Sequence, residues 1–229
     1  MRKVFMLGIC LFFAFSASAQ FGVKGSYHFS DAADWQVPTN NGSNPESLIG
    51  NGWSVGVDYW FRLKNYRMEF LPELNFSQLN QSPDNADWSN QVTFSSFFFN
   101  TNIYLFDFKG DCDCPTFSKQ GPTLDKGFFL QVSPGLTFAQ SEIDFNGNTF
   151  KADDLAFSIG LGAGFDLGVS DLVTVSPMAG FRYFPSISWD SLEESTGDEP
   201  PNLEVEEASS SLTQWYAGVR IGFRLDYGY

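Results

Sequence analysis

The last segment of the chain, residues 215–229, alternates between apolar and polar residues. Its apolar positions are Trp215, Ala217, Val219, Ile221, Phe223, Leu225, Tyr227 and Tyr229. Because successive side chains of a strand point to opposite faces, one face would be apolar and the other, with Arg220, Arg224 and Asp226, polar. Aromatic residues stand at both ends of the apolar face, as they do at a membrane–water interface. The pattern predicts the closing strand of an outer-membrane β-barrel.

Seven earlier segments have the same period of two, and turn or loop residues bound each of them. They are residues 21–29, 53–63, 66–77, 92–106, 128–140, 155–168 and 172–184. Each is long enough for a tilted transmembrane strand of about nine to eleven residues. Together the segments predict an all-β fold, an eight-stranded antiparallel up-and-down transmembrane β-barrel of the bacterial outer membrane.

The connections between these segments predict how the barrel is oriented. Long outer loops and short periplasmic turns are usual in such barrels. An even number of strands places both ends of the barrel segment on the same side of the membrane, and we expect that side to be the periplasm. Residues 64–65 and 169–171 are short turns on the predicted periplasmic side, whereas residues 107–127 are a long exception. The outer loop 185–212 holds eight acidic residues and no basic one. It has no calcium-loop spacing, so we expect a solvated, disordered loop.

The first residues predict a secretory signal peptide. Arg2 and Lys3 precede an apolar stretch over residues 4–15, and Ala17-Ser18-Ala19 is a small-residue cleavage site. The apolar stretch is too short for a transmembrane helix. We therefore expect a signal peptide over residues 1–19, secretion through the Sec route, and one barrel domain over residues 20–229.

Composition and charge narrow the classes of partner. The chain has 13 Lys and Arg against 27 Asp and Glu, a net charge of −14. This argues against a nucleic-acid partner, which requires basic surface. The 26 Phe, 21 Gly and six Trp suit strands that face lipid. Outer-membrane lipid is therefore the first expected partner.

Charged residues at inward strand positions predict a network within the lumen. The set is Lys24, Asp58, Arg62, Arg67, Glu69, Glu73, Asp166, Arg182, Arg220, Arg224 and Asp226. An eight-stranded barrel is about wide enough for side chains to fill it, and buried charges have to be paired. We interpret the set as a structural salt-bridge core that closes the barrel. A small conducting pore or an inner ligand site is the alternative.

Residues with catalytic or metal-binding chemistry are few. His28 is the only histidine, so a zinc site built on histidines is impossible. Cys112 and Cys114 lie in the long 107–127 turn, where a disulfide, a soft-metal pair and an intermolecular bridge are the alternatives. A barrel enzyme that modifies lipid would depend on His28. We expect no enzyme activity, no cofactor and no metal.

Four stretches carry a resemblance to a known family. They are residues 21–25, 133–136, 160–164 and 216–223, which read Phe-Gly-Val-Lys-Gly, Ser-Pro-Gly-Leu, Gly-Leu-Gly-Ala-Gly and Tyr-Ala-Gly-Val-Arg-Ile-Gly-Phe. With these motifs the chain resembles the PorT-like outer-membrane β-barrel family. The resemblance implies an integral barrel of about eight strands without a catalytic motif, and its namesake supports a protein secretion system. The long 107–127 turn departs from the family pattern.

The functional prediction is accordingly a structural or interaction protein of the cell envelope. It could assist protein secretion by contacting periplasmic or secretion-system proteins through residues 107–127. The alternative fold is a soluble periplasmic calycin-like binding barrel, which would place its apolar residues inside and its polar residues outside.

Overall fold

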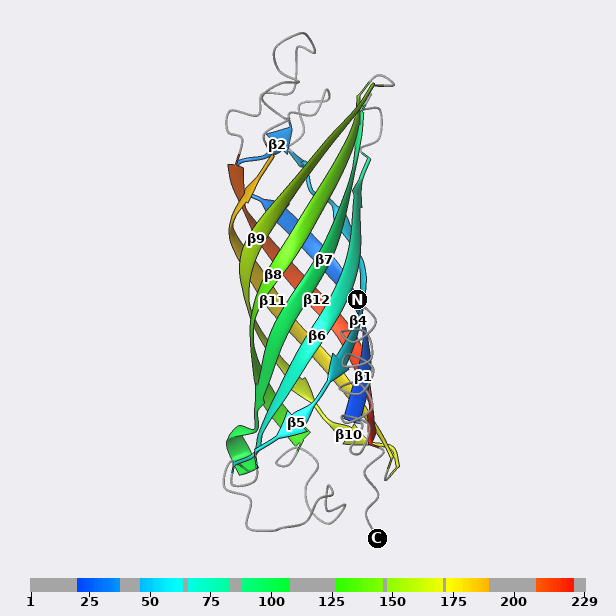
Figure 1. Ribbon diagram of the computed structural model, residues 1–229, viewed down its shortest axis with the longest axis vertical. Helices are drawn as coiled ribbons and strands as arrows, with labels where there is room; N and C mark the ends of the chain where they lie inside the picture. Colours follow the sequence, from blue (N-terminus) through cyan, green and yellow to red (C-terminus); the bar gives the residue numbers. More distant parts are fainter. Residues whose placement is uncertain are drawn as a thin grey trace, which may run out of the picture.

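Strands run through almost all of the chain that the computed structural model describes (Figure 1). The described residues are 20–37, 46–63, 66–82, 88–107, 127–145, 148–170, 172–189 and 209–224. No helix within these ranges is long and apolar enough to cross a membrane.

Eight long strands form the wall of a closed barrel. They are β1 (Gln20–Ala32), β4 (Asn51–Tyr59), β6 (Met68–Gln81), β7 (Trp88–Ile103), β8 (Phe128–Phe145), β9 (Asn148–Phe165), β11 (Val173–Ser188) and β12 (Ser209–Arg224). Each pairs antiparallel with the next along the chain, and β12 pairs with β1 to close the wall. The eight-stranded antiparallel barrel predicted from the alternation is therefore confirmed.

Five short elements complete the described fold. They are β2 (Gln36–Val37), β3 (Glu46–Ser47), β5 (Phe61–Arg62), β10 (Leu167–Gly168) and the 3₁₀ turn η2 (Leu105–Asp107). The predicted segment 53–63 is interrupted at Trp60, between β4 and β5, and the segment 155–168 is interrupted at Asp166, between β9 and β10. The last predicted strand reaches Arg224, and residues 225–229 lie outside the described residues.

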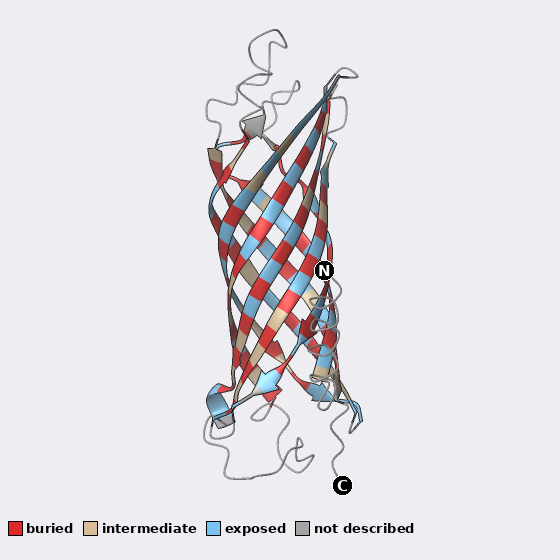
Figure 2. Ribbon diagram, in the orientation of Figure 1, coloured by how far each residue is buried: buried red, intermediate tan, exposed pale blue. Residues whose placement is uncertain are grey.

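Burial alternates along the strands in the direction that the membrane barrel requires. Buried and exposed residues form regular bands around the wall in Figure 2. The outward residues include Leu74, which is 63% exposed, and Leu155, which is 66% exposed, whereas Glu73 is 1% exposed. Large apolar side chains thus face outward and charged ones inward, which is the opposite of the calycin-like arrangement.

Cross-strand register shows where the outer surface changes from apolar to polar. One row of directly opposite outward residues is Val57, Leu74, Phe97, Leu136 and Phe157. Two residues further along each strand, the next row is Val55, Phe76, Ser95, Phe138 and Leu155. The row beyond that is Trp53, Gln78, Thr93, Gln140 and Asp153. The apolar belt on this side of the barrel therefore ends at the second of these rows.

The belt has the height of a membrane core. On β8 the outward residues are apolar from Phe128 to Phe138 and polar at Gln140, Glu142 and Asp144. The apolar stretch matches the roughly 9–11 residues that a tilted strand needs to cross the hydrocarbon layer. We call the end of the barrel that holds Gln20 and Arg224, which pair with each other, the terminus end, and the opposite end the far end.

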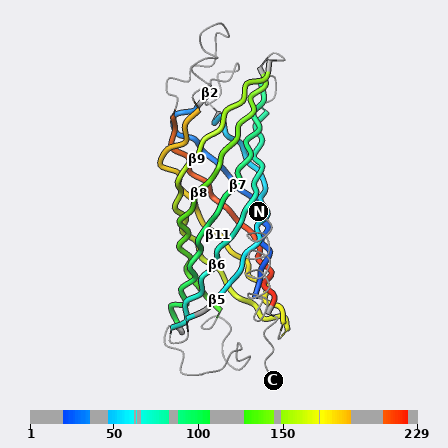
Figure 3. Tube along the Cα trace, in the orientation of Figure 1, coloured from blue at the N-terminus to red at the C-terminus, as the bar shows by residue number. Residues whose placement is uncertain are grey.

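Beyond the belt, the polarity of the wall is reversed. Strands β8 and β9 reach furthest toward the far end (Figure 3). Residues 141–154, which lie between the predicted segments 128–140 and 155–168, are mostly strand, because β8 continues to Phe145 and β9 begins at Asn148. Here the outward residues are polar and the inward ones are mainly apolar, which is the pattern of a barrel wall in water. The inward exceptions are Ser141, which donates a hydrogen bond to Asn90, and Asp154, which accepts one from the backbone of Ser188. The predicted segment ends at residues 140 and 155 were therefore wrong, because the polar outward residues of these strands resemble loop residues in sequence.

The inward apolar residues at the far end pack into one cluster. We call it the far-end cluster: Ala32, Trp35, Leu48, Ile49, Leu79, Trp88, Val92, Phe94, Ala139, Ile143, Ala156, Phe184, Ile187, Trp189 and Leu212. The rings of Trp35 and Trp189 stack at its centre, 4.3 Å apart and nearly parallel, and both are fully buried. The segments that flank the β2–β3 hairpin supply Trp35, Leu48 and Ile49.

Candidate functional site in the barrel lumen

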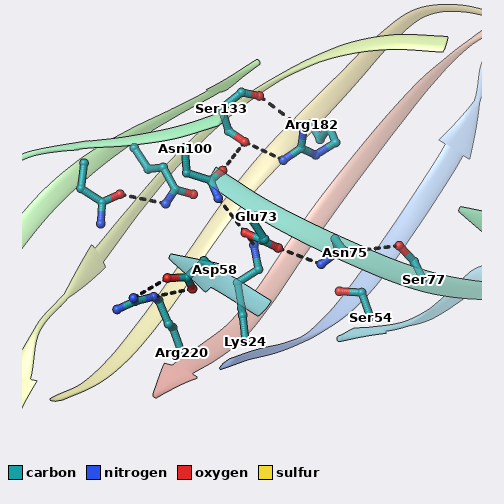
Figure 4. Close-up of polar contacts among 12 residues, drawn as sticks. Lys24, Ser54, Asp58, Glu73, Asn75, Ser77, Asn100, Ser133, Arg182 and Arg220 are labelled. Atoms are coloured by element: carbon teal, nitrogen blue, oxygen red, sulfur yellow. Dashed lines mark hydrogen bonds and ion pairs between the residues drawn. The ribbon is translucent and has the colours of Figure 1, made fainter. Parts of the chain in front are cut away.

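The interior between the terminus end and the far-end cluster is a layer of polar side chains. They point inward from β1, β4, β6, β7, β8, β11 and β12, and most of the layer is drawn in Figure 4. Buried polar groups are tolerated only when they are hydrogen-bonded, so the partners of each group define what the lumen can do.

Glu73 is the centre of this layer. Its carboxylate accepts a hydrogen bond from Lys24 Nζ at 2.6 Å, which is also an ion pair. Asn100 Nδ2 donates to the same oxygen, Oε2, at 2.6 Å, and Asn75 Nδ2 donates to Oε1 at 2.8 Å. Three strands, β1, β6 and β7, are therefore joined across the lumen through one carboxylate (Figure 4).

A second ion pair lies between Arg220 on β12 and Asp58 on β4. Arg220 donates from Nε to Asp58 Oδ2 at 2.8 Å and from Nη2 to Oδ1 at 2.5 Å, which is the bidentate geometry of a strong charge-assisted pair. The pair reaches across β1 over Gly22. A Cβ atom at Gly22 would lie 2.5 Å from Arg220 Nη2 and 2.6 Å from Asp58 Oδ2, so glycine leaves the space for the pair.

Arg182 has a different environment. Its described hydrogen-bond partners are Ser133, whose Oγ accepts from Nη2 at 2.8 Å, and Ser158, whose Oγ accepts from Nη1 at 3.1 Å. The guanidinium also lies over the ring of Phe98, 3.4 Å from its centroid. Hydroxyl groups and an aromatic face therefore hold this cation, where the sequence had suggested a salt bridge.

A third polar group lies at the terminus end. The Tyr104 hydroxyl is 2.9 Å from Glu69 Oε2 and 2.5 Å from Asp166 Oδ2, and Ser176 Oγ donates to Asp166 Oδ1 at 2.5 Å. The Arg67 guanidinium lies 4.6 Å from the centroid of the Tyr104 ring. This group joins the start of β6, the end of β7, the end of β9 and β11.

The side chains of several predicted site residues are not described by the structure. Arg62 and Arg224 belong to strands, but their side chains are not described, and neither is any atom of Asp226. Cys112 and Cys114 also fall outside the described residues. The proposed signal peptide, residues 108–126 of the long turn and residues 190–208 of the acidic loop lie outside them as well.

Seven of the predicted charged residues fall into the three groups around Glu73, Asp58 and Tyr104, and Arg182 has its own set of partners. Several of the neutral partners were not predicted from the sequence. Asn75, Asn100, Ser133 and Tyr104 are as buried as the charges that they contact. The first three occupy inward positions of the same alternating strands. The alternation of these strands therefore indicates that all three point inward, but an uncharged side chain gives no sign in the sequence that it belongs to a charge network.

His28 lies in the polar layer, just before the far-end cluster. Its Nε2 is 2.8 Å from Ser54 Oγ, and its ring faces Tyr216 at 5.9 Å. Its Nδ1 has no hydrogen-bond partner in the described structure, so the carboxylate that orients the histidine of a catalytic triad is absent there. The described residues contain no group of three or more metal-ligating side chains.

These features define the class of the protein. In hydrocarbon every backbone group has to be satisfied internally, so only helices and closed barrels cross a membrane. A closed antiparallel barrel with an apolar outer belt and a polar interior is the architecture of bacterial outer-membrane barrels. The chain is an outer-membrane β-barrel protein.

Solved structures with a similar fold are outer-membrane proteins of bacteria. Ail, the attachment invasion locus protein of Yersinia pestis, is 10% identical over 90% of this chain and 99% of that protein, with a TM-score of 0.47. Neisserial surface protein A is 10% identical over 90% and 96%, with a TM-score of 0.44. The outer-membrane protease OmpT of Escherichia coli is 8% identical over 91% and 94%, with a TM-score of 0.38. No family model and no curated protein matches the sequence.

Proposed function

We propose that the protein is a non-conducting, non-enzymatic barrel that acts by contacting other molecules at its two ends. The observation that carries this proposal is the filled lumen. The Glu73 layer joins β1, β6 and β7 through buried hydrogen bonds, and the far-end cluster beyond it consists of apolar side chains. An ion that crossed the barrel would have to break the hydrogen bonds of the Glu73 layer and then lose its hydration shell in the far-end cluster.

The far end is the side that we assign to the cell surface, because β1 begins and β12 ends at the opposite end of the barrel. The wall beyond the belt on β8 and β9 carries exposed polar groups, among them Glu142, Asp144 and Lys151. A rigid, water-facing wall of this kind can present loops to ligands or surfaces while the belt anchors it in lipid.

The absence of conductance is directly testable. In planar lipid bilayers, the purified full chain is expected to give no steady current steps, because the two lumen layers occlude the barrel in series. The variant Trp35→Ala removes one ring of the stacked pair in the far-end cluster. It should also stay closed, because the Glu73 layer is intact. Steady steps from the parent chain, scaling with salt concentration, would refute the proposal.

A secretion role is the finer form of the proposal. It is supported by the resemblance to the PorT-like family and by the apolar start of the long turn. Leu105 and Phe106 are exposed, at 51% and 67%, on the terminus end, which we assign to the periplasm. Such apolar groups next to the membrane offer a contact for a protein partner.

This role predicts crosslinking from the start of the long turn. A photoreactive residue in place of Phe106, in intact cells, is expected to capture a component of a secretion system. The matched control replaces Leu172, which is also exposed and apolar, in the short turn between β10 and β11. The secretion role would be abandoned if the two positions captured the same proteins, or if position 106 captured no secretion component.

A further inference from the structure

A hollow of about 570 Å³ lies on the outer surface of the barrel, centred on β7. Ser95 lies at its middle between Phe76 on β6 and Phe138 on β8, and the lining extends to Val55 on β4 and to Leu155 on β9. We call it the wall groove. Its volume is within the roughly 300–1,000 Å³ of small-molecule pockets, although it is open along one side.

Cross-strand register explains why the groove exists. Ser95 is directly opposite Phe76 on one neighbouring strand and directly opposite Phe138 on the other. A small side chain therefore lies between two exposed aromatic rings. The two flanking strands are two strand spacings apart, about 9–10 Å. The space over Ser95 between the two rings therefore suits a single hydrocarbon chain and is narrower than an α-helix with its side chains, about 10–12 Å.

The groove also has a defined depth in the membrane. It occupies the last apolar row of the belt, and the row on its terminus-end side is apolar throughout. The row on its far-end side places Gln78, Thr93 and Gln140 directly above Phe76, Ser95 and Phe138. The groove thus lies in the hydrocarbon layer and opens toward amide and hydroxyl groups at its polar boundary.

We propose that the wall groove binds one acyl chain of a membrane lipid in the leaflet next to the far end. The chain would lie along β7 over Ser95, between the two aromatic rings. The polar end of the lipid would then meet Gln78, Thr93 and Gln140, whose side chains can hydrogen-bond to its ester or amide oxygens. A second copy of the barrel is a poorer occupant, because its wall could reach Ser95 only with a single side chain.

The test measures lipid retention by the full chain in detergent, with dipalmitoyl phosphatidylethanolamine as the probe and native mass spectrometry as the readout. Ser95→Phe fills the groove and is expected to lower the affinity for the first bound lipid about tenfold, the effect of losing about two buried methylene groups. Thr101→Phe is the matched control. It introduces the same ring on the same face of β7, between Phe70 and Val132, outside the groove.

Ser95→Ala keeps the groove open and should bind like the parent chain. Ser95→Leu also fills the groove and replaces Ser95→Phe if that variant does not fold. Equal lipid affinity in the parent, the filled variant and Thr101→Phe would overturn the proposal. So would a dimer of the parent chain that Ser95→Phe dissociates, because the groove would then hold a second barrel.

Discussion

Replacing Asp58 with alanine is expected to lower the free energy of unfolding by about 3–5 kcal/mol. The substitution leaves the Arg220 guanidinium buried without the carboxylate that accepts two of its hydrogen bonds. The side chains of both residues are nearly inaccessible, at 2% and 11% exposure, so water cannot replace the lost partner. Urea unfolding of the barrel in lipid vesicles, followed by tryptophan fluorescence, measures the change.

Two controls show whether the loss of stability comes from the unpaired buried charge or only from the removal of a side chain. The double variant Asp58→Leu with Arg220→Met replaces the pair by apolar groups and is expected to be about as stable as the parent chain. Glu142→Ala breaks the exposed pair with Lys151 and should cost less than about 1 kcal/mol, because solvent screens that pair. If Asp58→Ala cost no more than Glu142→Ala, the lumen would have to be open to water.

The apolar belt could be predicted from the sequence because the alternation that produces it can be seen within each strand alone. Residues such as Leu161 and Gly160 alternate along one strand, and a strand has only two faces. The direction of the alternation followed from the charges on the other face, such as Arg220. Even the run Phe97-Phe98-Phe99 obeys the rule, since Phe98 points inward beneath Arg182 and its two neighbours point outward.

The far-end wall could not be predicted in the same way. Along β8 the outward residue is Phe138 at one position and Gln140 at the next outward one, so the polarity reverses while the strand continues. Polar residues such as Glu142 and Asp144 then resemble a loop. The Trp35–Trp189 stack joins residues 154 positions apart in the chain, and no local pattern indicates such a contact.

Predicting which polar residues are partners in the lumen requires the cross-strand register as well as the inward or outward alternation along each strand. The space that Gly22 leaves for Arg220 and Asp58 depends on how β12, β1 and β4 are aligned. The wall groove likewise depends on the position of Ser95 relative to two other strands. The alignment of three neighbouring strands is fixed only when the barrel closes. It therefore cannot be predicted from the sequence of each strand alone.

The reversal of polarity along β9 makes a second strong prediction. Leu161 and Asp153 both point outward from this strand, Leu161 within the belt and Asp153 beyond it. Leu161→Arg places a charge against the hydrocarbon core and is expected to cost about 2–4 kcal/mol of unfolding free energy. Asp153→Arg places the same side chain beyond the boundary, where the cost should be about 0–1 kcal/mol.

The difference in unfolding free energy between these two arginine variants, measured in lipid vesicles, is the most direct test of the orientation of the wall. The side chains introduced are identical, and the positions lie on the same face of the same strand. A cost of about 2–4 kcal/mol at position 161, with little change at position 153, is the result that a lipid-facing belt predicts. An arginine tolerated at position 161 as well as at position 153 would show that this face does not meet lipid.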